Sequence, residues 1–290
     1  MDPLSLKAYA KINIGLDITG KRKDGYHLLK TCMQTIGLYD EITVTADPKG
    51  QKEEIKITSD LCTDLADEEN ICFKAAALIK QEYGLKEKFL IDIKKNIPMA
   101  AGLAGGSADA AAVIEAADKI CGLRLLPEQK DELALSLGAD VPFCLRRGLW
   151  LCEGIGEILT PLPSLEGLVC VIIKPDFEVS TAWCYKAFDS LKENAHPDMD
   201  GALGALRKGN VKCFFEKSAN VLEQAAGLKH PEIEEIKKQL LLQGALLSLM
   251  SGSGSSVFGL FDDRKKAAEA LGFFKSLSYV QDVFLAELVY

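Results

Sequence analysis

A glycine-rich loop is the first feature of the chain that suggests chemistry. It reads Pro98-Met-Ala-Ala-Gly-Leu-Ala-Gly-Gly-Ser-Ala108, between a strand-like and a helix-like pattern. Glycines let backbone N–H groups approach phosphate oxygens, and a helix N-terminus adds about half a positive charge. The loop has neither the Gly-Lys-Ser/Thr ending of a P-loop nor the dinucleotide spacing G-x-G-x-x-G. Taken alone, it predicts phosphate binding and tight strand–helix packing about equally.

A second glycine loop, Ser251-Gly-Ser-Gly-Ser-Ser256, joins two strand-like segments near the C-terminus. Taken alone, this loop is more simply interpreted as a flexible hairpin connection. Two such loops, one in each half of the chain, favour a cleft between lobes that holds a polyphosphate.

Lys11 and Asp140 have the side chains that phosphoryl transfer to an alcohol requires. A carboxylate can accept the proton of the attacking hydroxyl, and a cation can stabilise charge beside it. Singly, Lys11 is more often a strand-edge lysine and Asp140 a turn residue at the mouth of a strand, and their spacing does not bring them together. Tyr26 and His27 offer a stacking plane and a polar ring; the alternative is a surface turn plugged by an aromatic residue.

The hydrophobic pattern predicts the elements that carry these residues. Ile12, Ile14, Leu16 and Ile18 alternate with polar residues, so residues 8–19 are expected to form a half-buried strand with Lys11 and Asn13 on its polar face. Helical spacing follows the first glycine loop up to Gly122, with Ser107 as the expected N-cap. The other expected strands cover residues 41–46, 89–93, 168–173, 245–250, 257–261 and 280–285, and the other expected helices cover residues 70–83, 127–138, 181–191, 231–243 and 264–274.

Composition narrows the class of protein. The chain has 290 residues, of which 48% are hydrophobic, enough for a sizeable core. Its 34 Lys and Arg against 42 Asp and Glu give a net charge of −8, which argues against a nucleic-acid partner. The short basic run Lys21–Arg22–Lys23 is either a solvated turn or a steering patch for an anionic substrate.

Nine cysteines are present without any C-x-x-C pair, which makes a disulfide framework or a structural zinc site unfavourable. Several, such as Cys170, stand in apolar surroundings and are expected to be buried. No leader-like segment and no apolar run of about 20 residues are found, so we expect a cytoplasmic protein without a membrane partner.

The motifs taken together resemble a known family. Ala10-Lys11-Ile12-Asn13 followed by Asp24-Gly25-Tyr26-His27 is similar to the N-terminal signature of the diphosphocytidyl-methylerythritol kinases, and the loop at residues 97–112 resembles the ATP loop of the wider GHMP kinase superfamily. Further similar motifs follow in the family's order across the whole chain: Leu137-Gly-Ala-Asp140-Val-Pro-Phe, Gly154-Ile-Gly156-Glu157, Val179-Ser-Thr181-Ala-Trp183 and Ser251-Gly-Ser-Gly254.

The resemblance implies an activity and a role for individual residues. It implies ATP-dependent phosphorylation of the C2 hydroxyl of 4-diphosphocytidyl-2-C-methyl-D-erythritol, with Asp140 as the base and Lys11 as the catalytic lysine. It places Asn13 in the substrate-contacting strand, Tyr26, His27 and Tyr185 around cytosine, and Thr181 near the substrate diphosphate. The implied ATP loop comprises Pro98, Met99, Ala100, Ala101, Gly102, Leu103, Ala104, Gly105, Gly106, Ser107 and Ala108.

Two positions depart from the family pattern. Ala108 stands where many members have a second serine, and Ser255 stands where a proline is usual. Because Ala108 offers no hydroxyl, we expect Mg²⁺ to be held mainly by the ATP phosphates and water, with no protein ligand assigned.

The implied fold class is α+β with two lobes. Residues 1–164 would form a ribosomal-protein-like GHMP N-terminal domain with a left-handed β-α-β unit, and residues 165–290 a ferredoxin-like C-terminal domain. The element order from residue 231 to residue 285 supports the second lobe independently.

Three alternatives remain open at this level. Another GHMP kinase, such as homoserine or mevalonate kinase, has no use for an aromatic residue beside Lys11. A ligand-sensing pseudokinase would not need both Lys11 and Asp140. A nicotinamide oxidoreductase would need a different glycine spacing.

Overall fold

The structure is a computed structural model that describes residues 2–48, 54–60, 68–192 and 194–290. The chain forms two compact units, each assembled from separate stretches of sequence. Unit 1 contains Met1–Ala10, Leu38–Met99 and Ala104–Arg146, and unit 2 contains Lys11–Gly37, Ala100–Leu103 and Arg147–Tyr290. The domain boundary at residue 164 refers to a different division of the chain and stays a prediction.

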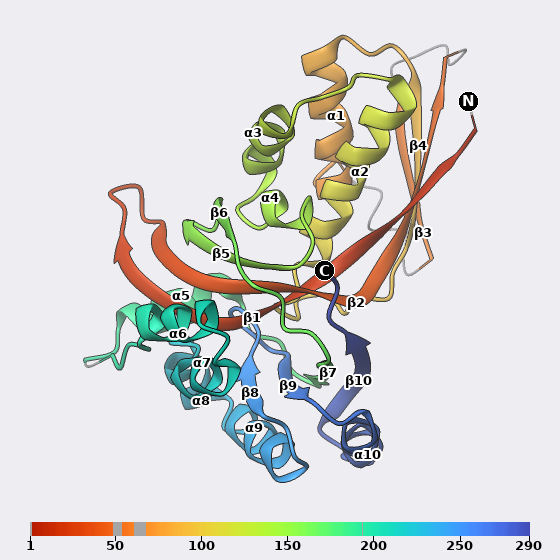
Figure 1. Ribbon diagram of the computed structural model, residues 1–290. Helices are drawn as coiled ribbons and strands as arrows, with labels where there is room; N and C mark the ends of the chain where they lie inside the picture. The colour runs from red at the N-terminus through yellow and green to blue at the C-terminus, as the bar shows by residue number, and fades with distance from the viewer. Residues whose placement is uncertain (1, 49–53, 61–67, 193) are drawn as a thin grey trace. The chain divides into compact units, whose positions relative to one another are not determined.

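Two long strands run through both units (Figure 1). Strand β1 covers Leu4–Lys21 and β2 covers His27–Asp47, both longer than the segments expected from the sequence. The C-terminal part of β2 pairs with β4 (Lys88–Lys94), and its N-terminal part pairs with β5 (Leu149–Gly154), both antiparallel. The part of β2 in unit 1 thus pairs with β4, and the part in unit 2 pairs with β5.

Unit 1 contains a β-α-β unit followed by three helices. Strand β3 (Ile55–Ser59) is parallel to β4 and is connected to it through α1 (Ile71–Tyr83). Asn70 caps α1 by accepting the Cys72 N–H, and Gly84 ends it with a φ of 64°. Helices α2 (Gly105–Cys121), α3 (Pro127–Leu137) and α4 (Val141–Cys144) complete the unit.

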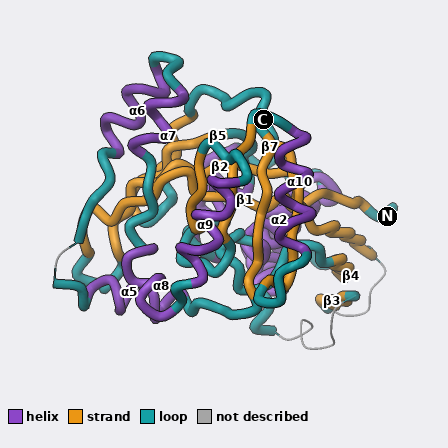
Figure 2. Tube along the Cα trace, turned by 90° about the horizontal axis from the view of Figure 1, so that it is seen from below, coloured by secondary structure: helices purple, strands orange, loops and turns teal. Residues whose placement is uncertain are grey.

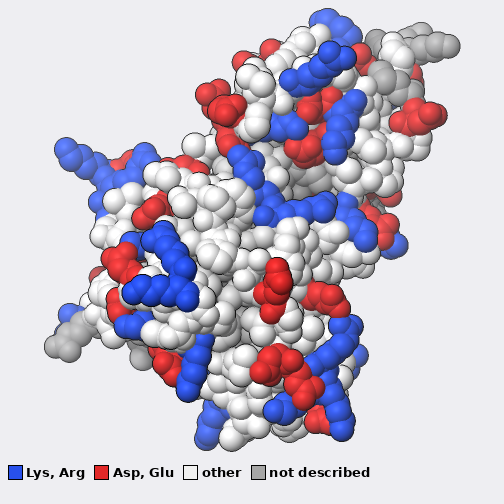
Figure 3. Space-filling view, in the orientation of Figure 1, with Lys and Arg blue, Asp and Glu red and all other residues white. Residues whose placement is uncertain are grey.

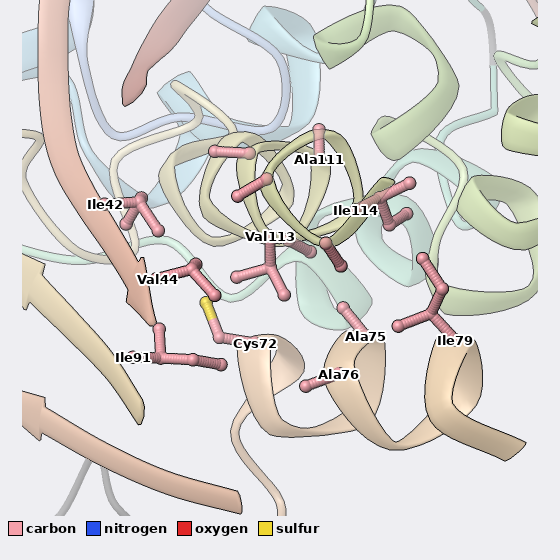
Figure 4. Close-up of a cluster of buried hydrophobic side chains, with 14 of the residues drawn as sticks. Ile42, Val44, Cys72, Ala75, Ala76, Ile79, Ile91, Ala111, Val113 and Ile114 are labelled. Carbon is pink, nitrogen blue, oxygen red and sulfur yellow. The ribbon is translucent and has the colours of Figure 1, made fainter. Parts of the chain in front are cut away.

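The core of unit 1 lies where α1 and α2 meet the strands (Figure 4). Ile42, Val44 and Ile91 project from the sheet toward Cys72 and Val113 on the two helices. Alanines occupy many of the buried positions of α2, which allows its backbone to approach α1 closely. The start of α2, at the end of the glycine loop, thereby rests on a packed core.

Unit 2 contains a four-stranded antiparallel sheet in the order β10-β7-β9-β8. Its strands are β7 (Val169–Pro175), β8 (Leu247–Met250), β9 (Val257–Phe261) and β10 (Val280–Glu287). Numbered along the chain, this is the order 4-1-3-2 with a β-α-β-β-α-β sequence of elements. That arrangement confirms the expected ferredoxin-like lobe.

Helices cover one face of this sheet. Helix α9 (Glu232–Leu242) packs on β8 and β9, and α10 (Arg264–Lys275) packs on β7 and β10. Figure 2 shows α9 and α10 on the viewer's side of the strands. Their buried side chains, with Leu16 and Ile18 of β1, form the core of unit 2. The remaining elements are β6 (Ile158–Pro161), α5 (Thr181–Asp189), α6 (Met199–Arg207), α7 (Val211–Lys217) and α8 (Glu223–Lys229).

The polar face of β1 differs from the prediction. Lys11 and Asn13 are only 3% and 1% exposed, so the strand is buried on both faces rather than one. The reason is that the loop segments around Gly102 and Gly252 cover the polar face within unit 2. A buried lysine and a buried asparagine must find hydrogen-bond partners.

Eight of the nine cysteines lie among the described residues, and none of these eight is in a disulfide bond. Cys170 is fully buried as expected, and Cys62 lies outside the described residues. Among the helices that the structure describes, none has the length and apolar character needed to cross a bilayer. Acidic and basic side chains are interspersed on the face shown in Figure 3.

Candidate functional site

Lys11 and Asn13 form a buried polar pair on β1. The Lys11 ammonium donates hydrogen bonds to Asn13 Oδ1 at 2.8 Å and to the Gly102 carbonyl at 2.9 Å. Positions 11 and 13 of one strand point to the same face, which is why the two side chains meet. The structure thus joins two sequence-predicted site residues to the glycine loop within unit 2.

Thr31 on β2 orients the asparagine. The Asn13 amide donates to Thr31 Oγ1 at 2.9 Å, and the Thr31 hydroxyl donates to the Gly15 carbonyl at 2.8 Å. With its nitrogen engaged in this way, Asn13 presents its oxygen to Lys11. Thr31 could not be predicted from the sequence, because a threonine in the middle of a strand does not indicate which residue of a neighbouring strand it contacts.

The first glycine loop packs directly against the second. Gly102 has a φ of 74°, and a Cβ built on it would lie 2.1 Å from the Ser251 carbonyl oxygen. The Ser251 hydroxyl donates to the Gly102 carbonyl at 3.0 Å, and the Ser256 N–H donates to the Ala101 carbonyl at 3.2 Å. Gly102 is therefore required by backbone packing against the second loop, a different contact from the strand–helix packing considered above.

Replacing Gly102 with alanine is expected to lower the free energy of unfolding by about 2–5 kcal/mol. The left-handed backbone costs about 1–2 kcal/mol for an alanine, and forcing a methyl group into the close contact with Ser251 costs about 1–3 kcal/mol more. Urea unfolding of the two proteins measures the difference. Gly84→Ala, with a similar φ of 64° and open space around it, isolates the backbone part of the cost; equal losses in both variants would contradict the packing explanation.

Asn220 holds the second loop through hydrogen bonds to its backbone. Its side-chain amide donates to the carbonyls of Met250 at 2.8 Å and Gly252 at 2.7 Å, and its Oδ1 accepts the Leu222 N–H. The residue is 2% exposed, so these bonds form away from water. Sequence reasoning missed it because Asn220 lies in a segment for which no element was expected.

The N-terminus of α2 differs from the expected cap. The helix begins at Gly105, and Ala104 with a φ of 57° is the N-cap residue without a side-chain cap. The prediction of Ser107 as N-cap is wrong, because the left-handed Ala104 turns the chain into the helix three residues earlier. The first-turn N–H groups of α2 thus receive no side-chain cap from Ala104, which is the arrangement found at anion-binding helix termini.

Asp140 belongs to unit 1 and occupies the N-cap position of α4. Its carbonyl accepts the Cys144 N–H, and its side chain makes no cap bond. The expectation that Asp140 stands at the mouth of a strand is wrong, because Val141–Cys144 is a short helix with Pro142 in its first turn. The pairing of Asp140 with Lys11 stays a prediction.

His27 and Tyr185 lie together in unit 2, and Tyr26 directly precedes His27 in the chain. The rings of His27 and Tyr185 are 4.8 Å apart and inclined by 31°, while Tyr26 is 58% exposed. His27 Nε2 lies 2.7 Å from Asp189 Oδ1. Hydrogen bonds from Lys21 and His27 lower the pKa of the Asp189 carboxyl. The structure thus brings together two of the three aromatic residues assigned to the cytosine pocket, and Asp189 was not expected there.

The basic run at Lys21–Arg22–Lys23 is partly neutralised. Lys21 Nζ lies 2.5 Å from Asp189 Oδ2, and Arg22 Nη2 lies 2.6 Å from Asp24 Oδ2. These pairs reduce the net charge that the run presents. The steering role of the run stays a prediction.

Thr181 is the first residue of α5, where Ser180 is the N-cap. Its hydroxyl lies 2.9 Å from the Ser253 hydroxyl of the second glycine loop. Within unit 2 the structure therefore connects the residue assigned to the substrate diphosphate with the segment Ser251–Ser256. Pro98, Met99 and residues 104–108 of the ATP loop belong to unit 1, whereas residues 100–103 belong to unit 2.

A buried charge cluster in unit 1 was not foreseen. The Lys95 ammonium contacts the carboxylates of Asp40 and Asp109, the second at 2.7 Å. Burial raises the pKa of Asp109 to about 8; the Lys95 ammonium opposes the rise, and the Asp40 carboxylate adds to it. Cys72 on α1 is a further titratable group near Asp109, and burial raises the pKa of its thiol.

We expect wild-type stability to fall, relative to that of Asp109→Asn, as the pH rises from about 4 to about 8. A carboxyl whose pKa is higher in the folded chain than in the unfolded chain binds its proton more tightly when folded. Its stabilising contribution is therefore complete below about pH 4 and lost as the pH rises through about 8, at about 1.4 kcal/mol per unit of pKa shift at most. Urea unfolding of both proteins across this range is the measurement, and parallel stability curves would contradict the raised pKa.

Family models identify the class of protein that this fold and these loops define. The model described as the GHMP kinases N terminal domain matches residues 70–148, and the model described as GHMP kinases C terminal matches residues 202–279. A solved homoserine kinase from Cytophaga hutchinsonii has a TM-score of 0.80 at 20% identity, covering 100% of this chain and 96% of its own. The architecture is that of the GHMP kinases.

Relatives with higher identity narrow the assignment. A curated protein of Lachnoclostridium phytofermentans, named 4-diphosphocytidyl-2-C-methyl-D-erythritol kinase, is 44% identical over 98% of this chain and 97% of its own. One of Clostridium acetobutylicum with the same name is 42% identical over 99% and 100%. A solved 4-(cytidine 5'-diphospho)-2C-methyl-D-erythritol kinase has a TM-score of 0.81 at 30% identity, over 99% and 100%. The chain belongs to the 4-diphosphocytidyl-2-C-methyl-D-erythritol kinase family.

Proposed function

We propose that the chain transfers the γ-phosphoryl group of ATP to the C2 hydroxyl of 4-diphosphocytidyl-2-C-methyl-D-erythritol. The products are the 2-phosphate and ADP, in the non-mevalonate route to isoprenoid precursors. The observation that carries this proposal is the 44% identity to a kinase of that name over nearly the full length of both chains. The homoserine kinase, with a similar fold at 20% identity, supports only the architecture.

Coupled ADP release is the direct test. Mg·ATP is offered with the cytidyl substrate and, separately, with homoserine, mevalonate and galactose. We expect turnover with the cytidyl substrate alone. Turnover with another alcohol instead would overturn the substrate while leaving the kinase class intact.

In the proposed reaction the C2 hydroxyl oxygen of the substrate bonds to the γ-phosphorus, and Asp140 accepts the proton of that hydroxyl. The bond between that phosphorus and the β–γ bridging oxygen breaks, and ADP leaves with the electron pair. Lys11 stabilises the developing alkoxide, and Asn13 holds the lysine through the bond to its Oδ1. We propose that Mg²⁺ binds mainly to the ATP phosphates and neutralises charge there.

The ATP phosphates are proposed to bind at Pro98–Ala108. Gly106 lies in the first turn of α2, and a Cβ on it would meet Ile71 at an ordinary 3.6 Å. The fold alone therefore does not require a glycine there, and a glycine costs about 0.5–1 kcal/mol relative to alanine inside a helix. Close approach of a phosphate to the helix N-terminus explains why the position has no side chain.

Gly106→Ala is expected to raise the KM for ATP roughly 10-fold or more, while thermal stability stays equal or rises. The added methyl group obstructs an N–H bond to a charged phosphate, a bond worth about 1.5–3 kcal/mol. Gly204→Ala in α6 is the matched control, because this helical glycine can likewise accept a Cβ without a clash. An unchanged KM for ATP in Gly106→Ala would remove α2 from the phosphate site.

Cytosine is proposed to bind at Tyr26, His27 and Tyr185. The ring contact between His27 and Tyr185 supports a pocket for a flat base, and the exposed Tyr26 ring has room to stack. Thr181 is proposed to contact the diphosphate that follows the cytidine. The eight described cysteines form no disulfide bond, which supports a reducing compartment, and we propose the cytoplasm.

Tyr26→Ala is expected to raise the KM for the cytidyl substrate roughly 5- to 150-fold with kcat nearly unchanged. Stacking of a base on an aromatic ring is worth about 1–3 kcal/mol, and it is present equally in the ground and transition states. Steady-state kinetics with Tyr26→Phe as control separates the ring from the hydroxyl. Equal KM values for wild type and Tyr26→Ala would place cytosine elsewhere.

A further inference from the structure

The buried cluster of Asp40, Lys95 and Asp109 lies at the base of the first glycine loop. Their side chains are 0%, 6% and 5% exposed, so three ionisable groups meet almost without water. Asp40 is on β2, Lys95 directly follows β4, and Asp109 is in the second turn of α2. All three residues belong to unit 1.

Asp40 holds the chain where the loop begins. Its Oδ1 accepts the N–H groups of Asn96 at 2.5 Å and Ile97 at 2.8 Å, the two residues before Pro98. Its Oδ2 contacts the Lys95 ammonium. One carboxylate thus fixes three consecutive residues at the entrance to the loop.

The same lysine reaches the element where the loop ends. Its bond to Asp109 Oδ2 at 2.7 Å connects the loop entrance to α2. A Cβ on Gly105 would lie 3.0 Å from Ile97 Cγ2 and 3.6 Å from Lys95 Nζ, so the first turn of α2 rests on the residues that Asp40 holds. The two ends of the loop are therefore fastened to one another through this cluster.

The cluster stabilises the core no better than apolar side chains would. Burying charges costs several kcal/mol each, and apolar residues of similar volume often serve stability as well or better. One oxygen, Asp109 Oδ1, is buried without a hydrogen-bond partner among the described residues. Such an arrangement fixes the positions of the residues that its hydrogen bonds join, rather than adding stability.

We propose that Asp40 is a positioning residue for the nucleotide phosphates. Through its bonds to Asn96 and Ile97, and through the Lys95–Asp109 bond, Asp40 sets the spacing between the start of the glycine loop and the first turn of α2. This inference rests on the proposed binding of ATP phosphates at Pro98–Ala108. Backbone N–H groups bind phosphate well only when their positions are fixed in advance, because ordering them on binding would cost affinity. Asp40 acts through the loop and does not itself contact ATP.

The test compares Asp40→Asn with Glu41→Gln. Glu41 is the next residue of the same strand and forms an exposed pair with Lys94 at 3.5 Å, so its loss should change nothing at the loop. We expect Asp40→Asn to raise the KM and the calorimetric Kd for Mg·ATP roughly 10-fold, the value of a charge-assisted hydrogen bond. The KM for the cytidyl substrate should change less than about twofold. A folded Asp40→Asn protein that binds ATP as the wild type does would overturn the proposal.

Variants of Asp109 decide the matter if Asp40→Asn does not fold. Asp109→Ala removes the bond to Lys95 and should raise the KM for ATP, whereas Asp109→Asn keeps an oxygen for Lys95 and should restore most of the affinity. A purely structural role would lower the thermal stability of Asp109→Ala without raising the KM for ATP more than the KM for the cytidyl substrate. Equal KM values for ATP in wild type, Asp109→Ala and Asp109→Asn would contradict the proposal.

The Gly106→Ala variant separates this inference from the function on which it rests. If Gly106→Ala leaves ATP binding unchanged, the loop is not the phosphate site and both ideas fail. If Gly106→Ala weakens ATP binding and the Asp40 and Asp109 variants do not, the phosphate site stands and only the positioning role fails.

Discussion

Asp140→Asn is expected to fold as the wild type does and to lose roughly 10²–10⁴-fold in kcat, the usual contribution of a positioned general base. Asparagine has nearly the same shape as aspartate but cannot accept the hydroxyl proton at neutral pH. The fold should tolerate it because the Asp140 side chain makes no cap bond to α4, and the backbone there is ordinary, with φ −83° and ψ −14°. The KM for ATP should change little.

Single-turnover phosphoryl transfer and circular dichroism check this expectation together. Asp131→Asn serves as control, because this partly exposed carboxylate of the same unit pairs with Arg146 and has no assigned role in the reaction. It should keep kcat within about twofold, since pairs near the surface contribute only about 0–1 kcal/mol. Wild-type turnover by a folded Asp140→Asn protein would remove this residue from the mechanism.

Lys11→Met is expected to lower kcat roughly 10²–10³-fold, the typical cost of removing one preorganised electrostatic group. The ammonium is held by Asn13 Oδ1 and the Gly102 carbonyl at 2.8 and 2.9 Å, inside a strand that is buried on both faces. Lys11→Arg should fare little better, because a planar guanidinium does not fit a site built for a compact ammonium. Some loss of stability is also expected, since Asn13 Oδ1 loses the lysine donor, while the Gly102 carbonyl keeps the Ser251 hydroxyl.

Lys7→Met is the matched control for Lys11→Met. Lys7 is on the same strand, four residues earlier and exposed, with its ammonium 4.2 Å from the Tyr39 ring centre. Kinetics are compared at a temperature where each variant is folded. Unchanged kcat in Lys11→Met would restrict Lys11 to a structural role.

Combining Lys11→Met with Asp140→Asn tests whether the two residues act in one step. Groups that act as a unit are strongly non-additive, so the double variant should lose little more than the worse single variant. A loss equal to the product of the two single effects would mean that they act independently.

Many of the helices and strands were predictable because their patterns are local, although β3, β5 and β6 were not expected. Helix α1, with Asn70 at its start and Gly84 at its end, follows the sequence almost to the residue. The strand order 4-1-3-2 also agrees with the expected lobe. By contrast, α6, α7 and α8 have only 7 to 9 residues each, too few for a clear helical period.

The missed site residues share a different property. Thr31, Asn220 and Asp40 act through partners that are distant in sequence, such as the 57 positions between Asp40 and Ile97. No periodicity signals such a contact. The burial of Lys11 and Asn13 escaped prediction for the same reason, because the segments that cover them come from residues 102 and 252.

The segmented make-up of unit 2 has a consequence for synthesis on the ribosome. Lys11–Gly37 is made early, yet the loop that covers its polar face, Ser251–Ser256, and the strand β10 are made near the end. All the segments of unit 1 have been translated once residue 146 is added, and N-terminal parts generally fold first as they emerge. Lys11 and Asn13 therefore spend most of translation without their final cover. Nascent chains stalled before residue 251 should leave residues 11–21 of β1 open to proteases and chaperones while unit 1 is already protected.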